Sequence, residues 1–194
     1  LGAAPASAAS AERRMTEGRD LGSAHGPVYA QSWSPDGVLL ATADYDQILV
    51  WNVDAGSEAG LLRGHASFVT GLAWSPGGLV LASASQDGTV RLWDGATFVE
   101  MTSLGIGEAL GCLTWSPDGL LLAVGTYERR IHVIDVGANA LLASCSTKTV
   151  DKRRDDVISI AWSPDGRTIA SGDLEGNIRL WDVATGQARL GFRE

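Results

Sequence analysis

Cysteine is scarce in this chain of 194 residues, and several other signals that define whole classes of protein are missing. Two cysteines, Cys112 and Cys145, are too few for a disulfide framework, which favours a reducing compartment. No apolar run approaches the roughly 18 residues that a membrane-spanning helix needs, and no signal-peptide pattern is present. The formal net charge of −8 argues against a surface that binds nucleic acid. We therefore expect an intracellular protein, cytoplasmic or nuclear, that binds neither membranes nor nucleic acids directly.

The first 24 residues lack hydrophobic periodicity and are rich in alanine and serine, which is typical of a disordered tail. The first residue is leucine and the first methionine is Met15, which fits either a fragment of a longer protein or translation from Met15. We expect residues 1–24 to form this tail and residues 25–194 to form one folded domain.

Tryptophan and glycine, in contrast, are abundant, with seven and 24 residues, and most of the tryptophans recur at a regular spacing. The string Trp-Ser-Pro occurs four times, and a second pair of residues follows each copy further along the chain. The strings begin at Trp33, Trp74, Trp115 and Trp162, and the following pairs are Trp51-Asn52, Trp93-Asp94, Ile134-Asp135 and Trp181-Asp182. A period of about 40 residues indicates a repeat protein. We expect the repeats to span about residues 25–62, 63–104, 105–150 and 151–194.

The second repeat shows what one unit contains. Residues 68–74, 79–83, 89–93 and 98–104 are β-prone, and turn sequences rich in proline, aspartate and glycine separate them. No long stretch has the apolar period of a helix. Each unit is therefore predicted to be a four-stranded antiparallel meander. Such a sheet has two apolar faces and must stack on further copies, which radial packing into a propeller achieves.

These motifs resemble the repeats of the WD-repeat (WD40) family. The matching residues in the second repeat are Gly64-His65, Trp74-Ser75-Pro76, Leu81-Ala82-Ser83, Asp87-Gly88 and Leu92-Trp93-Asp94, and the resemblance covers about residues 25–192. It implies an all-β protein, a β-propeller of four-stranded antiparallel blades. Propellers close with four to eight blades, and similar family members usually have seven. Four repeats thus imply an incomplete, open ring, whose missing blades would come from a longer chain or from a second chain.

The resemblance also implies a structural hydrogen-bond network in each blade, which joins a histidine, a serine, an aspartate and a tryptophan. The second repeat has all four, as His65, Ser83, Asp87 and Trp93. The first repeat keeps Thr42, Asp46 and Trp51, and its His25 is one residue closer to the following Trp-Ser-Pro string than in the second repeat. The fourth keeps Ser171 and Trp181, has Glu175 in place of the aspartate and has no histidine. The third repeat has Val124, Glu128 and Ile134 at these places. We expect packing alone to hold the third blade, with His132 on the surface.

Family resemblance further implies that partners dock on the rim around the central channel. The corresponding residues lie at the start of the first strand and before the network aspartate of each repeat: Tyr29, Tyr45, Phe68, Thr70, Gln86, Tyr127, Asp156, Ile158 and Leu174. Exposed aromatic residues on a rigid rim are typical of binding hot spots. The segment 148–156, which lengthens the loop between the third and fourth repeats, is either a solvated loop or a second partner-facing element.

The sequence therefore predicts a protein-interaction scaffold, as a subunit or domain of a multiprotein complex, with other proteins or peptides as partners. Catalytic residues, a metal site and a cofactor are not expected, because the repeat positions account for the histidines and acidic residues. Two alternatives are a propeller enzyme with a site in its channel and a degenerate fragment without a partner of its own.

Overall fold

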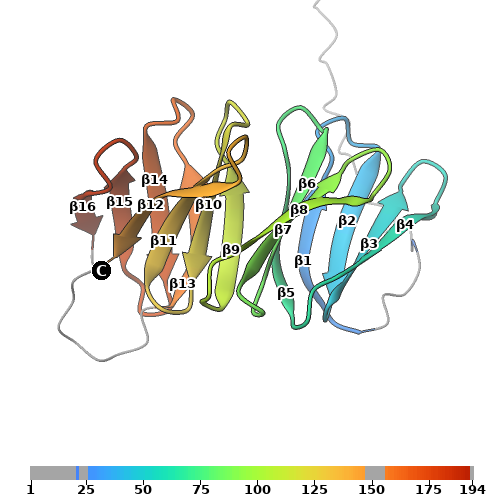
Figure 1. The fold of residues 1–194 in the computed structure, drawn as a ribbon, viewed down its shortest axis with the longest axis horizontal. Coiled ribbons are helices and arrows are strands. Elements are labelled where there is room, and N and C mark those ends of the chain that lie inside the picture. Colours follow the sequence, from blue (N-terminus) through green and yellow to red (C-terminus); the bar gives the residue numbers. More distant parts are fainter. Residues whose placement is uncertain (1–20, 22–25, 147–155, 193–194) are drawn as a thin grey trace, which may run out of the picture.

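The computed structural model describes residue 21, residues 26–146 and residues 156–192, which form four antiparallel four-stranded sheets without a helix (Figure 1). Each sheet is one blade built from consecutive strands. Blade 1 contains β1 (Val28–Trp33), β2 (Leu39–Asp44), β3 (Gln47–Asn52) and β4 (Ser57–Arg63). Blade 2 contains β5 (Val69–Trp74), β6 (Val80–Ser85), β7 (Thr89–Asp94) and β8 (Glu100–Gly105).

Blades 3 and 4 repeat this order. Blade 3 contains β9 (Leu110–Trp115), β10 (Leu121–Thr126), β11 (Arg130–Asp135) and β12 (Ala140–Ser146). Blade 4 contains β13 (Val157–Trp162), β14 (Thr168–Asp173), β15 (Ile178–Asp182) and β16 (Ala188–Phe192). The predicted all-β architecture of four-stranded antiparallel blades is confirmed. The predicted tail lies outside the described residues, apart from Leu21.

The turn after the first strand shows how the sequence sets the local structure. In blade 1, Ser34 Oγ donates to Asp36 Oδ1 at 2.5 Å, and Asp36 Oδ1 accepts from the Val38 amide at 3.0 Å. Gly37 follows with a φ of +75°, a conformation that glycine adopts without strain. Blades 3 and 4 repeat the serine–aspartate bond, so the Ser-Pro-Asp-Gly sequence encodes one tight turn.

Blades pack face to face, with the first strand of each blade against the first strand of the next. Three apolar clusters fill the three junctions, and each cluster combines residues of two blades. The first cluster, for example, joins Ile48 and Val50 of blade 1 with Trp74 and Trp93 of blade 2. The core of the molecule is therefore a row of interfaces between sheets.

The row does not close into a ring within the described residues, as predicted, and Figure 1 shows the first sheet at the right and the fourth at the left. Trp33 of blade 1 is 52% exposed, whereas its counterparts Trp74 and Trp115 are each 7% exposed. Leu49 and Trp51, on the outer face of blade 1, are nevertheless buried. The uncovered part of this face lies around Trp33.

Candidate functional site

A hydrogen-bond network in blade 2 joins the loop before β5, strand β6, the β6–β7 turn and strand β7. Trp93 Nε1 donates to Ser83 Oγ at 2.9 Å, and Ser83 Oγ lies 2.7 Å from His65 Nε2. His65 Nδ1 lies 3.0 Å from Asp87 Oδ2. One assignment of protons satisfies every contact: His65 donates through Nδ1 to the carboxylate and accepts through Nε2 from the serine hydroxyl. The structure thus brings together the four residues that the sequence singled out in this repeat.

The pKa values of this network agree with a neutral histidine and an ionised aspartate. Burial lowers the pKa of His65, and it outweighs the neighbouring Asp87, which favours the charged imidazole. Burial alone would raise the pKa of Asp87, but hydrogen bonds from Thr89, the Ala66 amide and His65 outweigh it and lower that pKa to about 2. Thr89, whose hydroxyl donates to Asp87 Oδ1 at 2.6 Å, is a member of the network that sequence reasoning missed.

Blades 1 and 4 keep the tryptophan–hydroxyl half of this arrangement. Trp51 Nε1 donates to Thr42 Oγ1 at 2.9 Å, and Trp181 Nε1 donates to Ser171 Oγ at 2.8 Å. Asp46 is half-buried in the β2–β3 turn, and its predicted partner His25 lies outside the described residues.

In blade 4 the exposed Glu175 does not take the place of the network aspartate. Instead the buried Asp173 accepts from the Asn177 amide at 2.9 Å and from Arg179 at 2.5 Å. The acidic residue that accepts hydrogen bonds inside this blade is therefore Asp173, at the end of β14, and not Glu175.

Two expectations for the third blade are wrong. Val124 and Ile134 do form an apolar centre, and Glu128 is exposed. His132, however, is 5% exposed and not a surface residue, because β11 lies between β10 and β12.

Packing is also not the sole support of blade 3, because His132 belongs to a second polar cluster. His132 Nδ1 lies 2.8 Å from Ser144 Oγ on β12, and His132 Nε2 lies 3.6 Å from Glu108 Oε2. Arg130 pairs with the same glutamate. Sequence reasoning missed this cluster because its members stand at places that no repeat motif marks.

Another position that the motifs did not mark is the last residue of the second strand in each blade. Asp44, Ser85, Thr126 and Asp173 occupy it, and all four are buried. In blades 2, 3 and 4 this side chain accepts a hydrogen bond from a backbone amide of the following turn, which belongs to Asp87, Glu128 and Glu175 respectively. A polar residue at this place caps the turn that carries the rim residues.

Three of the predicted rim residues form one aromatic cluster across blades 1 and 2, which we call the rim cluster: Tyr29, Tyr45 and Phe68. The Phe68 ring lies between the two tyrosines, edge-on to Tyr29 with centroids 5.1 Å apart and tilted against Tyr45 at 4.2 Å. Tyr29 and Tyr45 are 48% and 57% exposed. The rim cluster therefore presents aromatic surface to solvent on a rigid base of two packed sheets.

Tyr45 also adopts a strained backbone conformation. Its φ is +51°, in the left-handed region that bulky residues rarely enter. The Val69 amide of blade 2 donates to the Tyr45 carbonyl at 2.6 Å, which fixes the turn to the neighbouring blade. Strain of this kind persists where surrounding contacts hold it, and it is frequent at binding sites.

The other predicted rim residues are spread over blades 2 to 4. Gln86, Ile158 and Leu174 are exposed, whereas Thr70, Tyr127 and Asp156 are half-buried. The Thr70 hydroxyl donates to the Leu110 carbonyl of blade 3 at 2.7 Å, so it links two blades. The loop before Asp156, residues 148–155, lies outside the described residues.

Reactive groups are few in the described part of the chain. Burial raises the pKa of the Cys112 thiol to about 12 and also raises that of Cys145, so both stay protonated at neutral pH. No group of three histidine, cysteine, aspartate or glutamate side chains among the described residues could hold a metal ion. None of the described residues forms a helix long and apolar enough to cross a membrane.

Stacked four-stranded blades, open at both ends and carrying a histidine–serine–aspartate–tryptophan network, define a β-propeller repeat protein. The sequence matches the family described as WD domain, G-beta repeat, over residues 18–52, 56–94, 104–135 and 144–182. The chain therefore belongs to the WD40 family, whose repeats generally serve as protein-interaction scaffolds and not as catalysts. Among curated proteins, none matches the chain.

Proposed function

We propose that this chain is a scaffold subunit or domain of an intracellular multiprotein complex, and that it binds a partner protein or peptide at the rim cluster. One observation carries the proposal: Tyr45 is both strained and exposed, and it lies against Phe68 at the junction of two blades. Rigid aromatic side chains supply a large contact area at a low cost in conformational entropy. Gln86 of blade 2 and Leu174 of blade 4, which precede Asp87 and Glu175, are exposed on the same rim and extend the surface.

The open ends of the row supply a second part of the proposal. Further blades, from a longer chain or a second chain, would cover Trp33 on blade 1 and Ile178 on blade 4, which are 52% and 50% exposed. Uncovered sheet faces of this kind favour association.

The rim proposal is tested with the double variant Tyr45→Ala/Phe68→Ala in affinity purification followed by mass spectrometry. We expect the partners recovered by the wild-type chain to be lost while the circular dichroism spectrum is kept. A matched control, Leu120→Ala/Leu142→Ala, changes two exposed apolar residues of blade 3 and should leave recovery unchanged. Equal recovery by the rim variant and the wild type would move the search to residues 148–156.

A further inference from the structure

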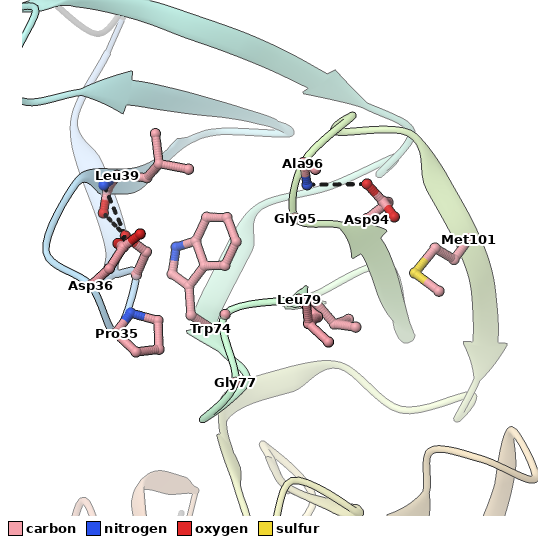
Figure 2. A pocket seen from close by; sticks show the side chains of 13 residues that line it. Pro35, Asp36, Leu39, Trp74, Gly77, Leu79, Asp94, Gly95, Ala96 and Met101 are labelled. Carbon is pink, nitrogen blue, oxygen red and sulfur yellow. Dashed lines mark hydrogen bonds between the residues drawn. The ribbon is translucent and has the colours of Figure 1, made fainter.

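A hollow of about 710 Å³ lies between blades 1 and 2, at the ends of the strands opposite to the rim cluster. The β1–β2, β5–β6 and β7–β8 turns surround it, and Figure 2 shows Trp74 standing between the first and the last of them. Its lining is mainly apolar and includes Pro35, Leu39, Trp74, Leu79 and Met101. Leu79 and Met101 are 77% and 57% exposed, so apolar side chains also surround the opening.

The lining of this hollow differs from the other junctions at one residue of blade 2. A valine follows the corresponding pair of residues in blades 1, 3 and 4, which is Trp51-Asn52, Ile134-Asp135 and Trp181-Asp182, whereas Gly95 follows Trp93-Asp94 in blade 2. Val136 and Val183 pack into the clusters at the next two junctions, together with Trp115 and Trp162 respectively. A Cβ at Gly95 would lie 2.9 Å from Trp74 Cζ3 and 2.6 Å from the Gly78 carbonyl, so no side chain fits there.

A second side chain is missing from the same hollow. Gly77 stands in the β5–β6 turn where the other three repeats have Asp36, Asp118 and Asp165. Those aspartates accept from the serine hydroxyl of their own turns, at 2.5 to 2.6 Å. Gly77 lines the hollow, and a Cβ there would meet nothing within 4 Å. Both glycines depart from the repeat pattern at one place in space.

The β7–β8 turn departs from the pattern at a third residue. Phe98 has a φ of +60° at the position that Gly56, Asn139 and Gly186 occupy in the other blades. A phenylalanine in this left-handed conformation is strained. Its ring packs across blade 1, where a Cβ at Gly60 would lie 2.4 Å from Phe98 Cδ2. The turn beside the hollow is thus tied to blade 1 at a cost in backbone strain.

Trp74 also lacks a contact that its counterparts make. Trp115 Nε1 donates to the Ala73 carbonyl at 2.9 Å, and Trp162 Nε1 donates to the Thr114 carbonyl at 3.2 Å, in each case on the preceding blade. Trp74 Nε1 is buried and has no hydrogen-bond partner in the described structure. An unpaired buried N–H is costly, so a ligand that supplied an acceptor there would gain affinity.

The charges around the hollow have one sign. Asp36 and Asp94 both line it, and no lysine or arginine is among the described lining residues. The Ser34 hydroxyl lowers the pKa of Asp36, and the Thr97 amide lowers that of Asp94, so both carboxylates are negative at neutral pH. In both residues Oδ1 accepts the hydrogen bonds from the turn. A cation beside an apolar group therefore matches this surface.

We propose that this hollow is a second binding site, which takes a peptide segment of a partner protein with one large apolar side chain next to a lysine or arginine. The apolar side chain packs against Trp74, Leu79 and Met101, which line the hollow. A peptide carbonyl accepts from Trp74 Nε1 after a small rotation of the indole, and the basic side chain faces Asp36 and Asp94. The site is separate from the rim cluster and does not depend on it.

The first experiment selects a phage-displayed random peptide library on the full 194-residue chain. We expect enriched peptides that share a large apolar residue adjacent to lysine or arginine. A fluorescein-labelled copy of the most enriched peptide then serves as the probe in anisotropy titrations. Selection that enriches no sequence, or that enriches acidic sequences, would overturn the proposal.

The second experiment compares matched pairs of variants with this probe. Asp36→Asn/Asp94→Asn should raise the Kd roughly tenfold, because each exposed ion pair contributes a modest free energy. Asn52 accepts from the Ala55 amide at 2.9 Å in the corresponding turn of blade 1, so the turn tolerates asparagine. The control Asp118→Asn/Asp135→Asn makes the same changes in blade 3 and should leave the Kd unchanged.

A second matched pair tests the apolar lining. Leu79→Ser/Met101→Ser should weaken binding, whereas Leu120→Ser/Leu142→Ser, at the corresponding exposed places of blade 3, should not. Equal losses in a test pair and its control would show that the peptide binds elsewhere. Loss of probe binding in the rim variant Tyr45→Ala/Phe68→Ala would place the peptide at the rim cluster and reject this site.

Discussion

At the scale of single residues, the network of blade 2 concentrates several polar contacts on one carboxylate. Asp87 accepts from His65, from the Ala66 amide and from both the amide and the hydroxyl of Thr89. Glu128, at the corresponding place in blade 3, is exposed. Two acidic residues that align in the repeat pattern therefore differ in what they stabilise.

Asp87→Ala should lower the free energy of unfolding by roughly 2–4 kcal/mol, because it leaves several donors of a mostly buried network unpaired. Glu128→Ala should cost less than about 1 kcal/mol, because the side chain lies at the surface. Urea titration followed by tryptophan fluorescence measures both changes. Equal shifts of the two midpoints would contradict the role assigned to Asp87.

Tyr45 offers the opposite case, a residue whose conformation costs stability. Asparagine tolerates the left-handed region far better than tyrosine, so Tyr45→Asn should keep or raise the free energy of unfolding, by up to about 1 kcal/mol. The same variant should lose partner recovery, because the ring that lies against Phe68 is gone. A thermal melt and a pull-down on one preparation measure both outcomes. A clear loss of stability would show that the ring serves the fold.

At the scale of the blade, the repeat pattern specifies a sheet without specifying its polar interior. Blade 2 uses the histidine network, blade 3 uses His132 with Ser144, and blade 4 uses Asp173 with Arg179. Blade 1 places Leu49 at the position that Arg91, His132 and Arg179 share. Each blade thus has a polar interior of its own, which is possible because blades touch only their neighbours.

These interiors make stability depend on pH. Burial lowers the pKa of His65 and of His132, although Asp87 and Glu108 respectively oppose the shift, and Arg130 lies beside His132. Below pH about 6.5 the unfolded chain therefore binds protons that the folded chain excludes, so stability present above that pH is lost as the pH falls. The contribution of Asp87, whose pKa is about 2, is lost only in stronger acid, from the ordinary carboxylate range down to that value.

The urea midpoint should accordingly fall between pH 7.5 and pH 5.5, two values on either side of the ordinary histidine pKa of about 6.5. His132→Leu, which introduces the residue type of the corresponding Leu49, should reduce this dependence by removing one of the two groups. An unchanged dependence in that variant would show that His132 is not titrating in this range.

Turn chemistry and the tryptophan period made the strands and their pairing predictable, and the family resemblance made the open row predictable. Asp-Gly and Ser-Pro sequences fix turns locally, and the matching strings place four units in register. Contacts between residues far apart in the chain could not be predicted in this way. The pairing of Glu108 with His132 and the edge-on contact of Tyr29 with Phe68 both join different segments. No local propensity encodes them. The hollow beside Gly95 was missed for the same reason, although its two glycines are visible once the repeats are aligned.

At the scale of the whole molecule, the row of blades ends in an uncovered tryptophan. Pro35, Pro76 and Pro117 each contact the turn glycine of the following blade, where a Cβ would lie 3.4 to 3.9 Å away, whereas Gly37 has nothing within 4 Å. Blade 1 therefore offers the surface that a preceding blade would cover, with Trp33 at its centre.

We expect the purified chain to be oligomeric or poorly soluble, because exposed apolar sheet surface drives association. Trp33→Lys should raise the monomer fraction in multi-angle light scattering, whereas the control Leu120→Lys, on blade 3, should not. A wild-type chain that stays monomeric and melts cooperatively would show that its end blades need no cover.

The assignment of every strand to a sheet of consecutive strands has a consequence for synthesis. None of the four described blades contains a strand from a distant part of the chain, so each hairpin can pair soon after it leaves the ribosome. A nascent blade then offers its apolar face to the blade that follows, and folding advances in step with translation. An interruption of synthesis would leave a shorter stack of finished blades, each with the same internal architecture as in the full chain.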